Sequence, residues 1–343
     1  MAHLNDDDDR GQLLLVTVLI LAAAFIALAL VVNSAIFTEN LATRDDTAGA
    51  EEALEYRAEV VGNVEALIEE TNANTDLTTE QDLGNHVREG IAGFTETDRS
   101  RQALAGQSIE VETEDVRFGT RIAQENADRN LTNLNNDADW TVASNVDTTR
   151  NVTFTFTEID TFEEGGFLPI FGDDRPFQME LDSGSNSWTL IVSSVGDFLG
   201  FPVDANEVVF SVQRNGITFD EACVRDESEL NDGITVDVTA GTVNGEPCEA
   251  LSRLQSDGTD LSFGAGIDES YDISFENADQ VEGTYSMITT GAQSIGSVAN
   301  NRNDDVPYAV NAIYDVSLSY LYQTHDVVYE TDIRAAPEEG RHD

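Results

Sequence analysis

The chain has 343 residues, of which 66 are acidic and 17 basic, and its formal net charge is −49. All of the basic residues are arginines; the sequence contains no lysine. Nucleic-acid binding needs clustered cations, whereas these arginines are scattered among acids, so the composition argues against it. A hydrophobic fraction of 40% is enough for a packed core and argues against a disordered acidic tail.

The acidic excess indicates a protein adapted to concentrated salt. So many carboxylates repel one another in dilute buffer, but molar salt shortens the Debye length to about 3 Å and screens that repulsion. This composition is typical of a halophilic archaeon. We expect salt cations to be partners that are held diffusely.

An apolar segment near the N-terminus predicts a membrane-spanning helix. From Leu13 to Val32 only Thr17 is polar, and a helix of about 20 apolar residues spans the hydrocarbon layer. Residues 12–33 are therefore predicted to form a transmembrane helix, with the membrane as partner of residues 13–32. A cleavable secretion signal has a shorter apolar region of about 7–15 residues, so we favour a retained anchor over cleavage after Ser34.

The residues before this segment resemble a class III (prepilin) signal. Arg10, Gly11 and Gln12 open the uninterrupted apolar run. The resemblance is to haloarchaeal type IV pilin-like surface proteins, and it implies that residues 1–11 are a charged leader cut between Gly11 and Gln12. It also implies packing against other pilin-like subunits through this helix. Major pilins carry a glutamate where this chain has Val16, which favours a minor-pilin-like component.

Arginine positions predict the orientation of the expected span. Arg10 adjoins its first end, while Arg44 lies about a dozen residues beyond the other. The positive-inside tendency then predicts a cytoplasmic N-terminus and an extracellular C-terminal domain. The expected localisation is a single-pass protein of the cell membrane, with a surface filament as a further expectation.

Two helical regions are predicted after the span. Residues 34–70 are expected to form a stalk helix, and residues 71–139 a helical segment with short strands. The stalk and the second helix, which starts at Thr78 or Thr79, are predicted from apolar residues at helical spacing. The expected stripes are Leu54, Ala58, Val61, Val64 and Ile68 in the stalk; Leu83, Val87, Ile91 and Phe94 in the second helix; and Ile122, Ala123, Ala127, Leu131 and Leu134 in a third segment over residues 120–134.

After residue 140 the apolar period changes to two, which predicts an antiparallel β-rich ectodomain over residues 140–337 before an acidic tail at 338–343. Asn215-Gly216 predicts a two-residue hairpin turn. The expected strands cover residues 152–159, 177–181, 188–192, 208–213, 217–219, 234–238 and 271–275, and a final hairpin joins 314–322 to 327–333.

Two pairs of residues predict covalent modification. Cys223 and Cys248 are the only cysteines, and in an exported domain they are expected to form one disulfide, with two free buried thiols as the alternative. The sequons at Asn130 and Asn151 are candidate glycosylation sites.

No catalytic, cofactor or metal site is predicted. His325 next to Asp326 is interpreted as part of a turn, since no nucleophile-elbow motif accompanies it. Acidic loops at 173–174, 226–232 and 257–260 could bind calcium, but none has EF-hand spacing. The apolar loops at 165–172 and 196–202 are expected to form a contact surface or to cover a sheet edge.

The expected fold is therefore α+β, with a long N-terminal transmembrane and stalk helix, short helices and an antiparallel β-rich extracellular domain. The expected function is non-enzymatic: a pilin-like, membrane-anchored structural or assembly protein of the cell surface, possessing no cofactor. A single-span anchored binding or sensory domain that does not assemble is the alternative.

Overall fold

The computed structural model describes residues 50–104, 107–160, 175–194, 207–252 and 259–337. Strands make up 48% of the structure and helices 22%. The described residues form two α-helices, one over residues 50–73 and α2 over Glu80–Leu104. The protein is therefore mostly β, which corrects the expected α+β class. The long N-terminal helix is not seen, and its apolar part at 12–33 lies outside the described residues.

The described strands and 3₁₀ helices follow α2 along the chain. They are β1 Ser108–Gln124, β2 Trp140–Val146, β3 Thr148–Ile159, β4 Phe177–Asp182, β5 Ser187–Ser193, β6 Glu207–Arg214, β7 Ile217–Asp226, η1 Glu227–Asn231, β8 Ile234–Asp237, β9 Thr242–Val243, β10 Glu246–Pro247, η2 Glu249–Leu251, β11 Tyr271–Glu276, η3 Ala278–Gln280, β12 Val281–Thr290, β13 Ser294–Ile295, β14 Tyr308–Gln323 and β15 Val328–Ala335. Every strand that we predicted beyond residue 140 is present, whereas β1, β2, β12 and the two-residue strands β9, β10 and β13 were not predicted.

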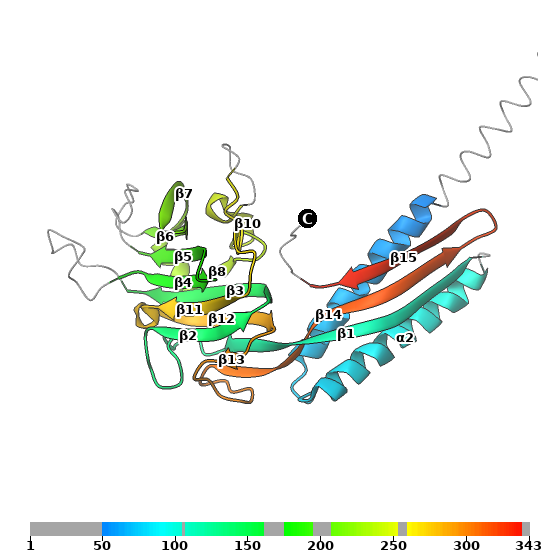
Figure 1. Ribbon diagram of the computed structural model, residues 1–343, viewed down its shortest axis with the longest axis horizontal. Helices are drawn as coiled ribbons and strands as arrows, with labels where there is room; N and C mark the ends of the chain where they lie inside the picture. Colours follow the sequence, from blue (N-terminus) through cyan, green and yellow to red (C-terminus); the bar gives the residue numbers. More distant parts are fainter. Residues whose placement is uncertain (1–49, 105–106, 161–174, 195–206, 253–258, 338–343) are drawn as a thin grey trace, which may run out of the picture. The chain divides into compact units, whose positions relative to one another are not determined.

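These strands form two sheets (Figure 1). The larger sheet has the order β10-β9-β8-β3-β12-β1-β14-β15, and the smaller has the order β13-β2-β11-β4-β5-β6-β7. In the first, β3 pairs antiparallel with both β12 and β8; in the second, β11 pairs antiparallel with β2 and β4. The antiparallel character predicted for residues 140–337 is confirmed.

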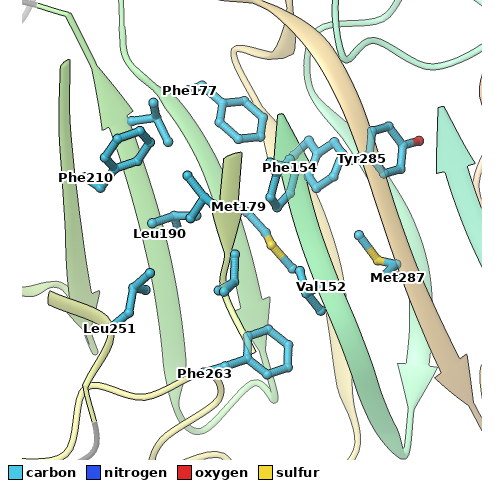
Figure 2. Close-up of a cluster of buried hydrophobic side chains, with 14 of the residues drawn as sticks. Val152, Phe154, Phe177, Met179, Leu190, Phe210, Leu251, Phe263, Tyr285 and Met287 are labelled. Atoms are coloured by element: carbon cyan, nitrogen blue, oxygen red, sulfur yellow. The ribbon is translucent and has the colours of Figure 1, made fainter. Parts of the chain in front are cut away.

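Aromatic side chains join the two sheets into a sandwich (Figure 2). Phe154 on β3 lies 5.9 Å from Phe177 on β4, and Phe156 lies 6.1 Å from Phe210 on β6, between ring centroids. On β3, Val152, Phe154 and Phe156 are buried, while the threonines between them are only half-buried. Full burial of such a phenylalanine contributes about 1.5–3 kcal/mol, so period-two alternation explains which face of β3 enters the core.

The β6–β7 hairpin forms where the sequence predicted it. Asn215 and Gly216 have φ values of 52° and 72°, and two successive positive φ values are the geometry of a type I′ turn. Arg214 then pairs with Ile217 across the turn.

The helix over residues 50–73 buries a different face from the one predicted. Val64 and Ile68 are buried as expected, but Leu54 is 52% exposed and Ala58 is also exposed. The buried stripe instead contains Ala53, Tyr56, Val60 and Thr71 together with the two correctly predicted residues. The first half of the predicted stripe was therefore wrong by about one residue in register.

Helix α2 follows its predicted pattern. Leu83, Val87 and Ile91 are buried, whereas Phe94, the fourth residue of the predicted stripe, is only half-buried. Thr79 precedes the first helical residue, and its side-chain oxygen accepts from the Asp82 amide at 3.2 Å, which satisfies one of the donors left free at a helix N-terminus.

The third predicted helical segment, over residues 120–134, is wrong. Residues up to Gln124 belong to β1, which pairs antiparallel with β12 and sets Ile122 opposite Met287. Leu131 is fully buried in the sandwich core rather than on a helix. Apolar residues at helical spacing were here overridden by strand pairing.

Neither α-helix in the described ranges is long and apolar enough to cross a membrane. The expectation of a single-pass membrane protein is corrected on this finding. Its basis, the segment Leu13–Val32, lies outside the described residues, as do the leader residues Gly11 and Gln12.

The chain divides into two compact units. The first unit contains residues 50–60, 95–104, 107–110 and 320–331 among those described. The second contains the remaining described residues, including almost all of both sheets.

Candidate functional site

The predicted disulfide is present. Cys223 on β7 bonds to Cys248 just before η2, with their Cα atoms 5.7 Å apart. Both cysteines are buried, at 7% and 1% exposure. The bond links the last strand of the smaller sheet to the segment after β10, so its role in the fold is structural.

The two sequons are in different environments. The Asn130 amide nitrogen donates to the Asp279 carbonyl at 2.8 Å and to the Val281 carbonyl at 3.4 Å, and Thr132 of its sequon is buried. Asn151 is half-buried on β3 and has a φ of 53°. Within the described ranges its side chain makes no hydrogen bond.

Arg129 organises the loop that contains the first sequon. Its guanidinium donates to five oxygens, at 2.7–3.5 Å: Gln124 Oε1, the carbonyls of Asn130, Thr132 and Asn133, and Asn136 Oδ1. Burial lowers the pKa of Arg129 below its usual value. Since arginine stays charged even after such a shift, it supplies a permanent cation to a loop rich in carbonyl oxygens.

The two histidines among the described residues each lie near a carboxylate. His325 is almost fully exposed, and its Nε2 atom lies 4.0 Å from Asp326, as expected for a turn. His86 on α2 is partly exposed and lies 3.1 Å from Glu70 of the neighbouring helix. Neither histidine contacts a serine or cysteine in any hydrogen bond found among the described residues.

In the described part of the acidic loops, Asp226 and Asp260 accept hydrogen bonds from nearby backbone amides. Asp226 caps η1 by accepting from the Ser228 amide at 2.9 Å, and it also accepts from the Ser228 hydroxyl. The hydroxyl bond, followed by the amide bond, lowers the pKa of the Asp226 carboxyl. Asp260 accepts in the same way from Ser262 at 3.0 Å. No cluster in the described part of the chain groups three metal-ligating side chains. Residues 173–174 and 257–258 and the apolar loops 165–172 and 196–202 lie outside that part.

In the first unit, tyrosines attach the helix to β14. The Tyr320 hydroxyl donates to the Ala53 carbonyl at 3.0 Å, and the Tyr322 hydroxyl donates to Glu52 at 3.0 Å. Burial, with Glu52 as acceptor, raises the pKa of Tyr322 to about 12. Tyr56 stacks on Tyr320 with ring centroids 6.2 Å apart.

The same helix has a second, exposed apolar face. The Tyr56 hydroxyl donates to Asp98 at 2.8 Å, which fixes the buried face toward α2 within this unit. Leu54 and Ala58, one helical turn apart, remain exposed. A leucine that is half accessible on a folded helix is ordinary in isolation, but with Ala58 it forms a short apolar strip on an otherwise glutamate-rich segment.

In the second unit, two arginines lie at one small cavity of about 270 Å³. It is lined by residues of the helix over 50–73 and of strands β1, β3 and β12, with polar groups from Glu69, Asn72, Arg121, Arg150, Asn151 and Ser286. Arg121 donates through Nε to Ser286 at 3.2 Å and through Nη2 to Glu125 at 3.5 Å. Four-fifths of its side chain is buried.

Arg150 is completely buried beside this cavity. Its guanidinium donates to the carbonyls of Tyr314 at 2.7 Å, Pro337 at 2.7 Å and Ile313 at 3.0 Å. It also lies over the Tyr314 ring, 5.6 Å from the centroid. Main-chain dipoles therefore hold this positive charge in place.

No sequence pattern predicted that Arg121 and Arg150 would lie at the same cavity. Arg121 and Arg150 are separated by 29 positions and neither belongs to a motif. The only signal nearby was the sequon at Asn151, which we interpreted as a modification site. Pairing of β1 with β12 and of β12 with β3 brings the groups together.

A family of unknown function (DUF7261) matches residues 7–152 of the chain. The matched region extends from the N-terminal segment to the first part of β3 and therefore includes both α-helices. No curated protein matches the chain. No solved structure matches it either.

Proposed function

We propose that the protein is a non-enzymatic, pilin-like structural subunit that assembles with copies of itself or with related subunits through its N-terminal helical part. The observation that supports this is the helix over residues 50–60. Its inner face is attached to β14 by tyrosine hydrogen bonds, while Leu54 and Ala58 stay exposed. A helix that is rigidly held by its own unit and retains an outer apolar strip can pack against another helix.

The resemblance of Arg10, Gly11 and Gln12 to a prepilin signal adds to this proposal. Processing at that position would leave Gln12 as the first residue of the mature chain. Mass spectrometry of the N-terminus of protein purified from its native source tests this directly. A chain beginning at Gln12 is expected, and one that retains residues 1–11 contradicts the resemblance.

Substitution of the exposed strip tests assembly itself. Leu54→Asp combined with Ala58→Asp places charges on the proposed contact without touching the buried face. In molar salt, sedimentation velocity is expected to show large particles for the native chain and small ones for this variant. Val328→Asp is the matched control, because Val328 is 66% exposed on β15 and undergoes the same change of character.

Two results would contradict assembly. The first is a native chain that sediments as a single species of about the monomer mass across a wide concentration range, as the alternative of a non-assembling binding domain predicts. The second is equal disruption by Val328→Asp, which would indicate a general effect of added charge.

A further inference from the structure

We propose that the cavity lined by Arg121, Arg150, Asn151 and Ser286 binds a small carboxylate that also carries hydroxyl groups. This inference is independent of assembly, since every residue it uses lies in the second unit. The cavity has a volume of about 270 Å³, many times the volume of about 10–15 Å³ that a single water molecule needs. It therefore has room for a small organic acid and is larger than a bare inorganic ion requires.

Residues that line this cavity carry unused hydrogen-bond donors. Arg121 donates hydrogen bonds from Nε to Ser286 and from Nη2 to Glu125. Its Nη1 group has no hydrogen-bond partner among the described residues. The Asn151 amide is likewise unbonded in the described part of the chain. Ser286 accepts from Arg121 and still has its own hydroxyl proton to donate. Three donors of this kind suit the two oxygens of a carboxylate.

The positions of these donors are fixed before any ligand arrives. The Arg121 guanidinium is restrained by its two bonds, and the left-handed backbone of Asn151, with φ of 53°, sets the direction of its side chain. Such a conformation is uncommon for a residue other than glycine, although asparagine tolerates it better than most. Donors that need no reordering lose less conformational entropy on binding.

Charge favours an anion at this place in spite of the acidic chain. Arg150 is fully buried behind the cavity and held by main-chain carbonyls, so solvent screens its charge poorly. Arg121 adds a second positive charge, partly offset by Glu125. Together they create a local positive potential in a molecule whose net charge is −49.

Glu69, which also lines the cavity, is the reason for proposing that the ligand carries hydroxyl groups. Glu69 is exposed at the helix end that borders the cavity, and a carboxylate there accepts hydrogen bonds while repelling a second anion. The Asn72 amide group is already engaged, since it donates to the Ile313 carbonyl and accepts from the Ile313 amide. The ligand is thus oriented with its carboxylate toward Arg121 and a hydroxyl toward Glu69.

Titration calorimetry of the full-length chain with glucuronate, at constant molar potassium chloride, tests this proposal. We expect saturable binding with a dissociation constant of about 1 mM or tighter. Arg121→Met and Asn151→Gly should each weaken it at least tenfold. The glycine variant retains the positive φ and removes only the amide side chain. Arg99→Met is the matched control, because that arginine is half-exposed in the first unit, and it should change affinity less than twofold.

The remaining titrations separate the parts of the inference. Glucose, which lacks the carboxylate, should not bind, and acetate, which lacks hydroxyls, should bind at least tenfold more weakly than glucuronate. Thermal melting in the same salt confirms that each variant is folded. The proposal is overturned if glucuronate shows no saturable binding, if Arg99→Met weakens binding as much as Arg121→Met, or if acetate binds as tightly.

Discussion

Breaking the disulfide between Cys223 and Cys248 should measurably destabilise the sandwich. The two cysteines are 25 positions apart, and closing a loop of that length removes unfolded-chain entropy worth about 3.5 kcal/mol at room temperature. Because both cysteine side chains are buried, the bond is shielded from solvent in the folded state. Its loss should therefore be measured as a lower free energy of unfolding.

The assay is urea unfolding in constant molar potassium chloride, followed by tryptophan fluorescence. Trp188 reports on the same unit, since it is buried on β5 and its indole donates to the Leu261 carbonyl at 3.3 Å. With a urea slope of about 3 kcal/mol/M, the midpoint should fall by roughly 1 M on reduction. Comparing oxidised and reduced forms of one protein keeps both sulfur atoms in the core.

The double variant Cys223→Ala/Cys248→Ala checks the same loss without a reductant. It should be at least as unstable as the reduced protein, because it also loses sulfur packing. A reduced midpoint within about 0.2 M of the oxidised one would refute the loop-closure reasoning.

Three further outcomes are expected. Burial raises the pKa of Tyr271 to about 12, above the unfolded value near 10. The contribution of Tyr271 to the free energy of unfolding is therefore intact below pH 10 and is lost as the pH rises toward 12. Urea midpoints should show this loss, up to about 2–3 kcal/mol, and Tyr271→Phe should lessen it. Gly283→Ala should lower the free energy of unfolding in urea by about 2 kcal/mol or more, because its Cβ would lie 2.1 Å from the Thr155 carbonyl oxygen at a φ of +152°. Gly93→Ala, which has open space around the new methyl group, should instead stabilise α2 by about 0.5–1 kcal/mol. Equal effects of the two substitutions would contradict the steric account. Thermal midpoints should fall steeply as salt is diluted, and a midpoint independent of salt would count against adaptation to concentrated salt.

Period-two alternation was sufficient to predict most of the sandwich. On β3 it identified both the strand and its buried face, because Val152, Phe154 and Phe156 alternate with threonines. Asn215-Gly216 predicted a turn through purely local chemistry, since those two residues tolerate positive φ. Local signals of this kind need no knowledge of the partner strand.

The strands that were missed depend on distant partners. β1 carries Ile122 and Ala123 at positions that also fit a helix, and only its pairing with β12, more than 150 residues later, makes it a strand. The helix over 50–73 offers two apolar stripes. Which of them is buried is decided by Tyr320 of β14 and by Asp98, the hydrogen-bond partner of Tyr56.

The candidate binding site could not be read from the chain for the same reason. Arg150 looks like any other isolated arginine until the carbonyls of Ile313 and Tyr314 surround it. Arg121 and Asn151 meet only after three strands have paired. Polar groups assembled from remote segments leave no spacing pattern in the sequence.

Arg129 gives its loop a cation that is covalently part of the polypeptide. A calcium ion ligated by similar oxygens would exchange with the medium and could be stripped by a chelator, whereas a guanidinium cannot leave. The conformation of residues 129–136 should accordingly be indifferent to divalent-cation supply. That independence keeps the conformation of this region constant when the calcium concentration of the medium changes.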